Sequence, residues 1–134
     1  MLSYVYVALG SAAGGVARWT VGVWLQRLAG GAPPAVFPVG TLVVNASGSF
    51  VLGLLAVLLA RAGDARGDAA RLLLGVGFCG GYTTFSTFSL DTVALLETRG
   101  WVPAVTNVVA SVGAGLVGVA AGMLLGRAAM GRLA

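Results

Sequence analysis

GFCGGYTTFSTFS, residues 77–89, is the stretch that decides the fold of this chain. It lies between an apolar run that starts at Leu72 and another that ends at Leu96, so we expect it at membrane depth. It combines two adjacent glycines, several hydroxyl side chains and two phenylalanines three residues apart. Inside a bilayer, backbone that departs from helical geometry is tolerated only where protein or a water-filled cavity receives its polar groups. The stretch therefore predicts a functional break in a membrane helix.

The composition of the whole chain indicates a membrane protein. Of its 134 residues, 58% are hydrophobic and only 9% are charged, and the mean hydropathy is +0.97, whereas roughly 25% of a soluble domain is charged. A spanning helix needs ~20 mostly apolar residues. We expect four spans, at residues 2–26, 37–60, 72–96 and 101–126, joined by short loops within one all-α domain that covers residues 1–134.

The residue types exclude several classes of function. The chain has no histidine and one cysteine, which disfavours zinc, haem, a proton relay through histidine and an internal disulfide. No nucleophile–base pair is visible, so an enzyme is disfavoured as well. The first segment lacks a basic leader and stays apolar after Arg18, which indicates a retained span rather than a signal peptide. The eight arginines lie near the ends of the spans, so the net charge of +4 indicates membrane anchoring rather than nucleic-acid binding.

The same arginines predict an orientation. The N-terminus, the loop at 61–71 and the C-terminal tail share one side of a four-span protein, and that side carries five arginines. The opposite side carries two, Arg27 and Arg99. Because cytoplasmic loops are enriched in arginine and lysine, this count favours a cytoplasmic N-terminus.

Polar side chains at membrane depth are the candidate pore residues outside the opening stretch. In the second span Asn45 shares one helix face with Thr41, and in the fourth span Asn107 and Ser111 form a narrow polar stripe. An asparagine at this depth can bond a neighbouring helix, which is worth ~0.6 to 2 kcal/mol, or donate its N–H groups to a passing anion. Neutral donors bind an anion without trapping it. Because the chain also contains the third-span stretch, we favour a role of Asn45 in transport over a purely structural one.

The opening stretch itself supplies two kinds of contact. Adjacent glycines followed by threonines favour local unwinding, which frees backbone carbonyls that can coordinate a small cation such as Na⁺. After the break, Phe85 and Phe88 lie on one helix face. The positive edges of their rings would favour a small anion, and ordinary aromatic packing is the alternative. Arg18 either extends to the membrane surface or stands at an aqueous vestibule, where it raises the local concentration of anions.

Glycine is abundant, with 22 residues, and it forms stripes on the first, second and fourth spans. Small residues allow membrane helices to approach closely. Four short helices also bury little surface by themselves, so we expect the chain to form an oligomer.

Three further stretches accompany the third-span string at 77–88, and they are GGVARW at 14–19, PVGT at 38–41 with Asn45, and GSF at 48–50. With these motifs the chain resembles the Fluc (CrcB) fluoride channels of bacteria. The resemblance extends over all four spans. The third-span string, in its order after the asparagine of the second span, is highly specific.

The resemblance implies a dual-topology homodimer of antiparallel subunits in the bacterial inner membrane, with two pores for the passive export of fluoride. It also implies a structural Na⁺ held by the backbone carbonyls of Gly80 and Thr83, and a vestibule arginine at Arg18. Polarity and resemblance together give these candidate fluoride-pore residues: Asn45, Phe85, Phe88, Ser86, Thr87, Asn107, Ser111 and Thr41. Relatives often carry tyrosine at the position of Asn107, and a hydroxyl can stand at that of Gly115.

Two other classes of protein compete with a fluoride channel. Small multidrug transporters also have four helices, but they depend on a carboxylate inside the first span, and this chain has no acidic residue before Asp64. Asp91 and Glu97 fall toward the end of the third span, where we expect exposure or a salt bridge. A subunit of a non-transporting membrane assembly would leave Asn45 and the two phenylalanines unexplained.

Overall fold

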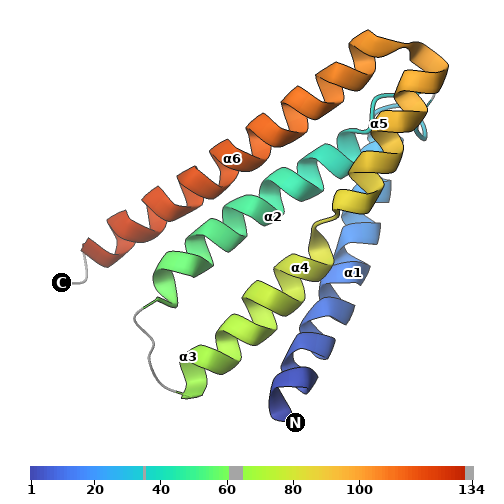
Figure 1. The fold of residues 1–134 in the computed structure, drawn as a ribbon. Coiled ribbons are helices and arrows are strands. Elements are labelled where there is room, and N and C mark those ends of the chain that lie inside the picture. Colours follow the sequence, from blue (N-terminus) through green and yellow to red (C-terminus); the bar gives the residue numbers. More distant parts are fainter. Residues whose placement is uncertain (35, 61–64, 132–134) are drawn as a thin grey trace.

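The computed structural model describes residues 1–34, 36–60 and 65–131, and every regular element in these ranges is helical (Figure 1). The elements are α1 (Leu2–Leu28), α2 (Val39–Leu58), α3 (Ala65–Ala70), the π-helix η1 (Arg71–Cys79), α4 (Gly80–Tyr82), α5 (Phe85–Arg99) and α6 (Trp101–Gly131). Since α3, η1 and α4 follow one another without a gap, they form one helical rod, and α5 continues the same segment beyond Tyr82.

The four predicted segments all appear as helices. The first and fourth are longer than predicted, since α1 reaches Leu28 and α6 reaches Gly131, and the second is shorter. Among the described residues, α2 and α6 are each long and apolar enough to cross a membrane by their own length and composition. The all-helical architecture with apolar helices agrees with the predicted membrane fold.

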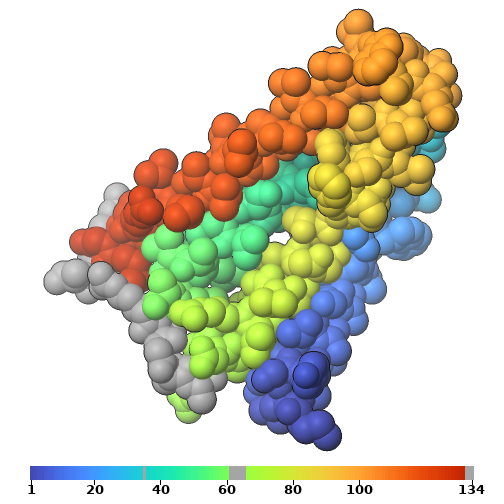
Figure 2. Space-filling view, viewed as in Figure 1, coloured from blue at the N-terminus to red at the C-terminus, as the bar shows by residue number. Residues whose placement is uncertain are grey.

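The helices form two closely packed pairs. In Figure 1, α2 and α6 lie side by side, and α1 lies along η1 and α4. The start of α1, the end of α6 and α3 lie at one end of the molecule, where the two pairs spread apart. At the other end α5 leads to α6 through Gly100, whose positive φ of 84° permits the sharp turn. Figure 2 shows small openings between α2 and the rod formed by η1 and α4.

Glycines account for the close approach within each pair. A Cβ atom on Gly122 of α6 would collide with the carbonyl oxygen of Phe50 in α2, and one on Gly53 of α2 would collide with the carbonyl oxygen of Val119. A Cβ on Gly10 of α1 would likewise collide with backbone of η1. The predicted role of glycine in helix packing is confirmed at these positions, because only a residue without a side chain lets the backbones meet.

Gln26 fastens the end of α1 to the start of α2. Its Nε2 donates to the carbonyl oxygens of Gly31, at 2.7 Å, and Phe37, at 3.0 Å. Its Oε1 accepts the N–H of Gly40 at 3.1 Å. The first turn of a helix has N–H groups without an internal partner, and Pro38 at the cap provides no side-chain acceptor. Gln26 therefore caps α2 from a distant part of the sequence.

The outer surface of the chain is strongly apolar. Large hydrophobic side chains on every long helix are exposed, such as Trp19 on α1, Leu90 on α5 and Val117 on α6, each 69% exposed. The buried hydrophobic residues among those described are few and include Val44 and Leu95. Exposed apolar surface of this extent marks a surface that faces lipid or another protein.

Replacing Gly122 with alanine should destabilise the pair formed by α2 and α6. The added methyl group meets the backbone of Phe50, and overpacking of this kind costs about 1–3 kcal/mol. Thermal unfolding in detergent measures the effect. Gly113→Ala is the matched control on the same helix, because no atom lies within 4 Å of its added Cβ. Equal melting temperatures for the two variants would contradict the packing role of Gly122.

Candidate functional site

The third segment leaves helical geometry at two threonines. Helix α4 ends at Tyr82, Thr83 has φ −83° and ψ 159°, and Thr84 has φ −150° and ψ 120°. The two preceding glycines remain helical. Both residues at the break are β-branched, and such side chains favour extended backbone. Thr84 then caps α5, since its Oγ1 accepts the N–H of Thr87 at 3.1 Å.

Asn45 of α2 binds the backbone of Thr84 through two hydrogen bonds. The N–H of Thr84 donates to Asn45 Oδ1 at 2.7 Å, and Asn45 Nδ2 donates to the carbonyl oxygen of Thr84 at 2.9 Å. Both polar groups that the extended residue exposes are thereby satisfied. Nδ2 carries two hydrogens, and this pair of bonds uses one of them. Asn45 therefore bonds a neighbouring element and keeps a second donor.

The bonds to Asn45 change the hydrogen bonding of the residues before the break. In an uninterrupted helix the N–H of Thr84 would donate to the carbonyl of Gly80, four residues earlier, but it donates to Asn45 instead. Gly80 is exposed, and a Cβ atom there would meet nothing within 4 Å. The carbonyl oxygen of Thr83 accepts a hydrogen bond from Arg18 Nη1 at 3.3 Å.

A groove of about 450 Å³ runs beside the break. It brings together four of the predicted pore residues, which are Asn45, Phe85, Phe88 and Ser111. The two phenylalanine rings lie 5.5 Å apart between centroids, with an angle of 51° between their planes, and Phe85 is 79% exposed. The remaining lining residues are Ser49, Leu52, Thr83, Thr84, Val112, Gly115, Leu116 and Val119. One surface thus combines amide and hydroxyl groups with aromatic rings.

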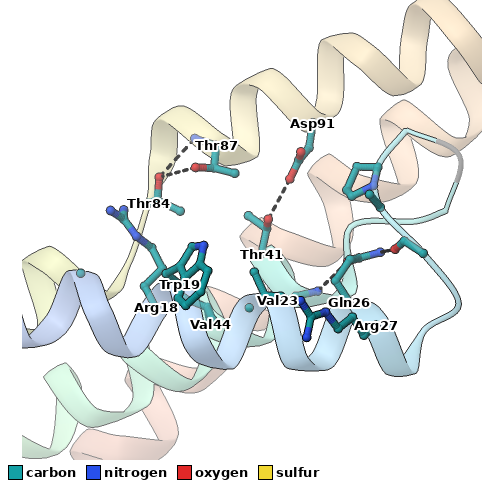
Figure 3. Close-up of a pocket in the computed structure, with 16 residues that line it drawn as sticks. Arg18, Trp19, Val23, Gln26, Arg27, Thr41, Val44, Thr84, Thr87 and Asp91 are labelled. Carbon is teal, nitrogen blue, oxygen red and sulfur yellow. Dashed lines mark hydrogen bonds between the residues drawn. The ribbon is translucent and has the colours of Figure 1, made fainter.

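A second cavity, of about 540 Å³, lies between α1, α2 and α5 and also borders Thr84 (Figure 3). Thr84 lines both this cavity and the groove. The charged and polar residues of the second cavity are Arg18, Gln26, Arg27, Thr41, Thr84, Thr87 and Asp91. With two arginines and one aspartate, its lining carries a net positive formal charge, and such a cavity raises the local concentration of anions.

The other candidate residues lie away from the groove. Thr41 and Thr87 line the second cavity together with Arg18. Ser86 is exposed and belongs to neither set of lining residues, although its Oγ lies 3.2 Å from Thr84 Oγ1. Asn107 is 1% exposed and is buried where α5 and α6 meet, behind Ser111.

The prediction for Asp91 is wrong, because this residue is buried and lines the second cavity. We expected exposure or a salt bridge, but the side chain is 7% exposed and its Oδ2 accepts a hydrogen bond from Thr41 Oγ1 at 2.8 Å. The same expectation is confirmed for Glu97, which is exposed. The spacing held a usable signal, because Asp91 lies four residues after Thr87, a candidate residue of the same cavity, and so shares its side of the helix.

Comparison with known proteins places the chain in a family. Residues 5–123 match the family described as CrcB-like protein, Camphor Resistance (CrcB). The chain belongs to the CrcB-like family. It is 44% identical over 127 residues to a protein of Caulobacter sp. (strain K31), covering 95% of this chain and 96% of the relative. It is 47% identical over 128 residues to a protein of Rhizobium johnstonii, covering 96% and 98%. Both relatives carry the name Fluoride-specific ion channel FluC.

The match confirms the resemblance predicted from the sequence, and it covers nearly the whole chain. In this CrcB-like protein, the matched residues include the break, Asn45 and both phenylalanines. The relatives are named as ion channels rather than enzymes. Among the described residues, no three histidine, cysteine, aspartate or glutamate side chains gather into a group that could hold a metal ion.

Replacing Asn45 with leucine should destabilise this CrcB-like protein. The N–H and carbonyl of Thr84 would each lose a partner, and an unsatisfied buried polar group costs about 1–3 kcal/mol. Thermal unfolding in detergent measures the loss. Ser49→Ala is the matched control from the same helix and groove, because Ser49 supplies no hydrogen bond to the break. A melting temperature of the leucine variant equal to that of the control would contradict the role of Asn45 in holding the break.

Proposed function

We propose that this chain is the subunit of a fluoride-selective ion channel that lets fluoride leave the bacterial cytoplasm passively, which lowers fluoride toxicity. The observation that carries the proposal is the groove beside the break, where Asn45 and Ser111 lie near the pair Phe85 and Phe88. Membership of a family whose relatives are named fluoride-specific ion channels supports it.

The two cavities suggest a path for the anion. Arg18 and Arg27 in the second cavity attract anions from solution. Fluoride then passes Thr84, which borders both cavities, and reaches the groove. There it exchanges water for the second N–H of Asn45, the hydroxyl of Ser111 and the positive edges of the phenylalanine rings. None of these groups carries a full charge, so the anion is bound without being trapped.

A second copy of the chain would complete the path. The groove is open on the surface of one subunit, Phe85 projects from it, and Gly80 presents bare backbone. We propose an antiparallel homodimer embedded in the inner membrane, with the groove closed at the subunit contact. The arginine count, which favours one orientation, includes Arg61 and Arg132, and both lie outside the described residues.

The backbone carbonyl oxygens at the break are suitable ligands for a structural Na⁺. In a continuous helix the N–H of Thr84 would donate to the carbonyl of Gly80, but here it donates to Asn45, and Gly80 is exposed. Carbonyl oxygens suit a hard cation, as in the unwound helices of transporters. The Thr83 carbonyl has two lone pairs, one of which accepts the bond from Arg18. Two carbonyls from one chain are few for such an ion, so the proposed site also takes two from a second copy.

The buried Asp91 is the observation that bears on the competing class of proton-coupled transporters. An ionisable group at membrane depth is what proton coupling requires. Here, however, the carboxylate shares its cavity with Arg18 and Arg27. A cationic drug would meet two positive charges at that point, so the surroundings of Asp91 favour an anion.

Proteoliposomes that contain the purified chain and are loaded with fluoride should release it when a fluoride electrode follows the external solution. Release should need no ATP or proton gradient, since the proposed path is passive. Liposomes loaded with chloride serve as the control and should retain their anion. Equal release of both anions would contradict selectivity, and retention of fluoride would contradict the channel itself.

Replacing Phe88 with leucine should slow fluoride efflux at least about tenfold, the effect of ~1.4 kcal/mol on a barrier. Leucine keeps much of the volume but removes the positive ring edge from the groove. Phe78→Leu is the matched control, because the ring of Phe78 stacks on Tyr82, at 5.8 Å between centroids, and does not line the groove. Similar efflux through both variants would mean that the ring edges of Phe88 have no special role.

A further inference from the structure

A chain of three hydrogen bonds links α6 to α5 behind the groove. Asn107 Nδ2 donates to Thr92 Oγ1 at 2.8 Å. Thr92 Oγ1 donates to the carbonyl oxygen of Phe88 at 2.7 Å. On the other side of the amide, Ser111 Oγ donates to Asn107 Oδ1 at 3.4 Å. The chain thus begins at a hydroxyl that lines the groove and ends on the backbone of Phe88, which lines it too.

The direction of these bonds is fixed by the number of available protons. A threonine hydroxyl has one hydrogen, and Thr92 gives it to Phe88. Thr92 can therefore only accept from Asn107, which turns Nδ2 toward α5 and Oδ1 toward Ser111. Asn107 is 1% exposed, so water does not compete for either atom.

Ser111 differs from five other hydroxyl residues in the helices, and like Ser11 and Thr41 it bonds outside the preceding turn. The hydroxyls of Thr20, Ser89, Thr92, Thr98 and Thr106 each donate to the carbonyl four residues earlier, at 2.6–2.9 Å. Such bonds to the preceding turn are the usual choice of serine and threonine inside helices. Ser111 instead donates to the side chain of Asn107, at the long distance of 3.4 Å. A typical O–H···O bond is ~2.7–2.8 Å, so its proton is weakly held.

We propose that Asn107 is a positioning residue that keeps the Ser111 proton available to an anion in the groove. Its Oδ1 draws the hydroxyl away from the strong bond to the preceding turn and holds it loosely until an anion takes the proton as a hydrogen bond. Thr92 sets the orientation of the amide and ties it to the backbone beside the ring of Phe88. The inference rests on the proposed fluoride function, and it assigns Asn107 a place behind the path rather than on it.

A double-mutant cycle on fluoride efflux from proteoliposomes tests this role. Asn107→Leu and Ser111→Ala should each slow efflux several-fold. In the first variant the hydroxyl of Ser111 should bond the carbonyl of the preceding helix turn instead of the anion, and in the second the hydroxyl is absent. Since Asn107 acts through Ser111, the double variant should be no slower than the slower single variant. A double variant slowed by the product of the two single factors would overturn the proposal, and so would wild-type efflux through Ser111→Ala.

Thr92→Val is a nearly isosteric variant that tests the same positioning role, and it can be used if Asn107→Leu does not fold. It should slow efflux in the wild-type background and have no further effect in the Ser111→Ala background. Thr106→Val is the matched control, since that hydroxyl bonds only its own helix, at 2.8 Å to Val102, and it should conduct like wild type.

Thermal unfolding of the same variants separates positioning from mere packing. Loss of the bonds between α5 and α6 should lower the melting temperature in both backgrounds, whereas the effect on efflux should appear only where Ser111 is present. An effect of Thr92→Val on efflux that persists without Ser111 would overturn the proposal. A wild-type chain that releases no fluoride would instead refute the proposed function, and the inference with it.

Discussion

The two hydrogen bonds between Asn45 and the backbone of Thr84 are the constraint on which the site depends. A helix interrupted at membrane depth exposes N–H and C=O groups that lipid cannot satisfy, and each costs several kcal/mol. Asn45 accepts a hydrogen bond from the N–H of Thr84 at 2.7 Å and donates one to its carbonyl oxygen at 2.9 Å. This allows α5 to begin afresh at Phe85, with Thr84 bordering both the groove and the second cavity.

The glycines matter because they bring the helices close enough for these bonds to form. Gly48 lies one turn after Asn45 on α2, and a Cβ atom there would collide with the side chain of Thr83 and lie 3.0 Å from the ring of Tyr82. On the opposite side of the rod, a Cβ on Gly14 of α1 would lie 2.8 Å from the backbone nitrogen of Tyr82. The break is therefore held between the glycines of α1, which meet its backbone, and those of α2, which meet its side chains, and its geometry is set by packing as well as by hydrogen bonds.

Much of this could be predicted from the sequence. Hydropathy located the four helical segments. Polarity at the expected membrane depth singled out Asn45 and Ser111, and the stretch at 77–89 singled out the phenylalanine pair; the groove brings all four residues together. The rotation of each helix about its own axis, which decides the face that is buried, was harder to predict. Spacing of four residues places Asn107 and Ser111 on one face, but only packing decides that Asn107 is buried against Thr92. The burial of Asp91 depends on its contact with Thr41, 50 positions away, which composition cannot reveal.

The most direct test of this account is fluoride efflux through the Asn45→Leu variant, measured on proteoliposomes after the variant has been shown to fold. Efflux should be at least about tenfold slower than wild type, equivalent to ~1.4 kcal/mol on the barrier. The break loses both of its bonds and the groove loses an N–H donor. Efflux at the wild-type rate through a folded variant would contradict the claim that Asn45 joins the break to the anion path.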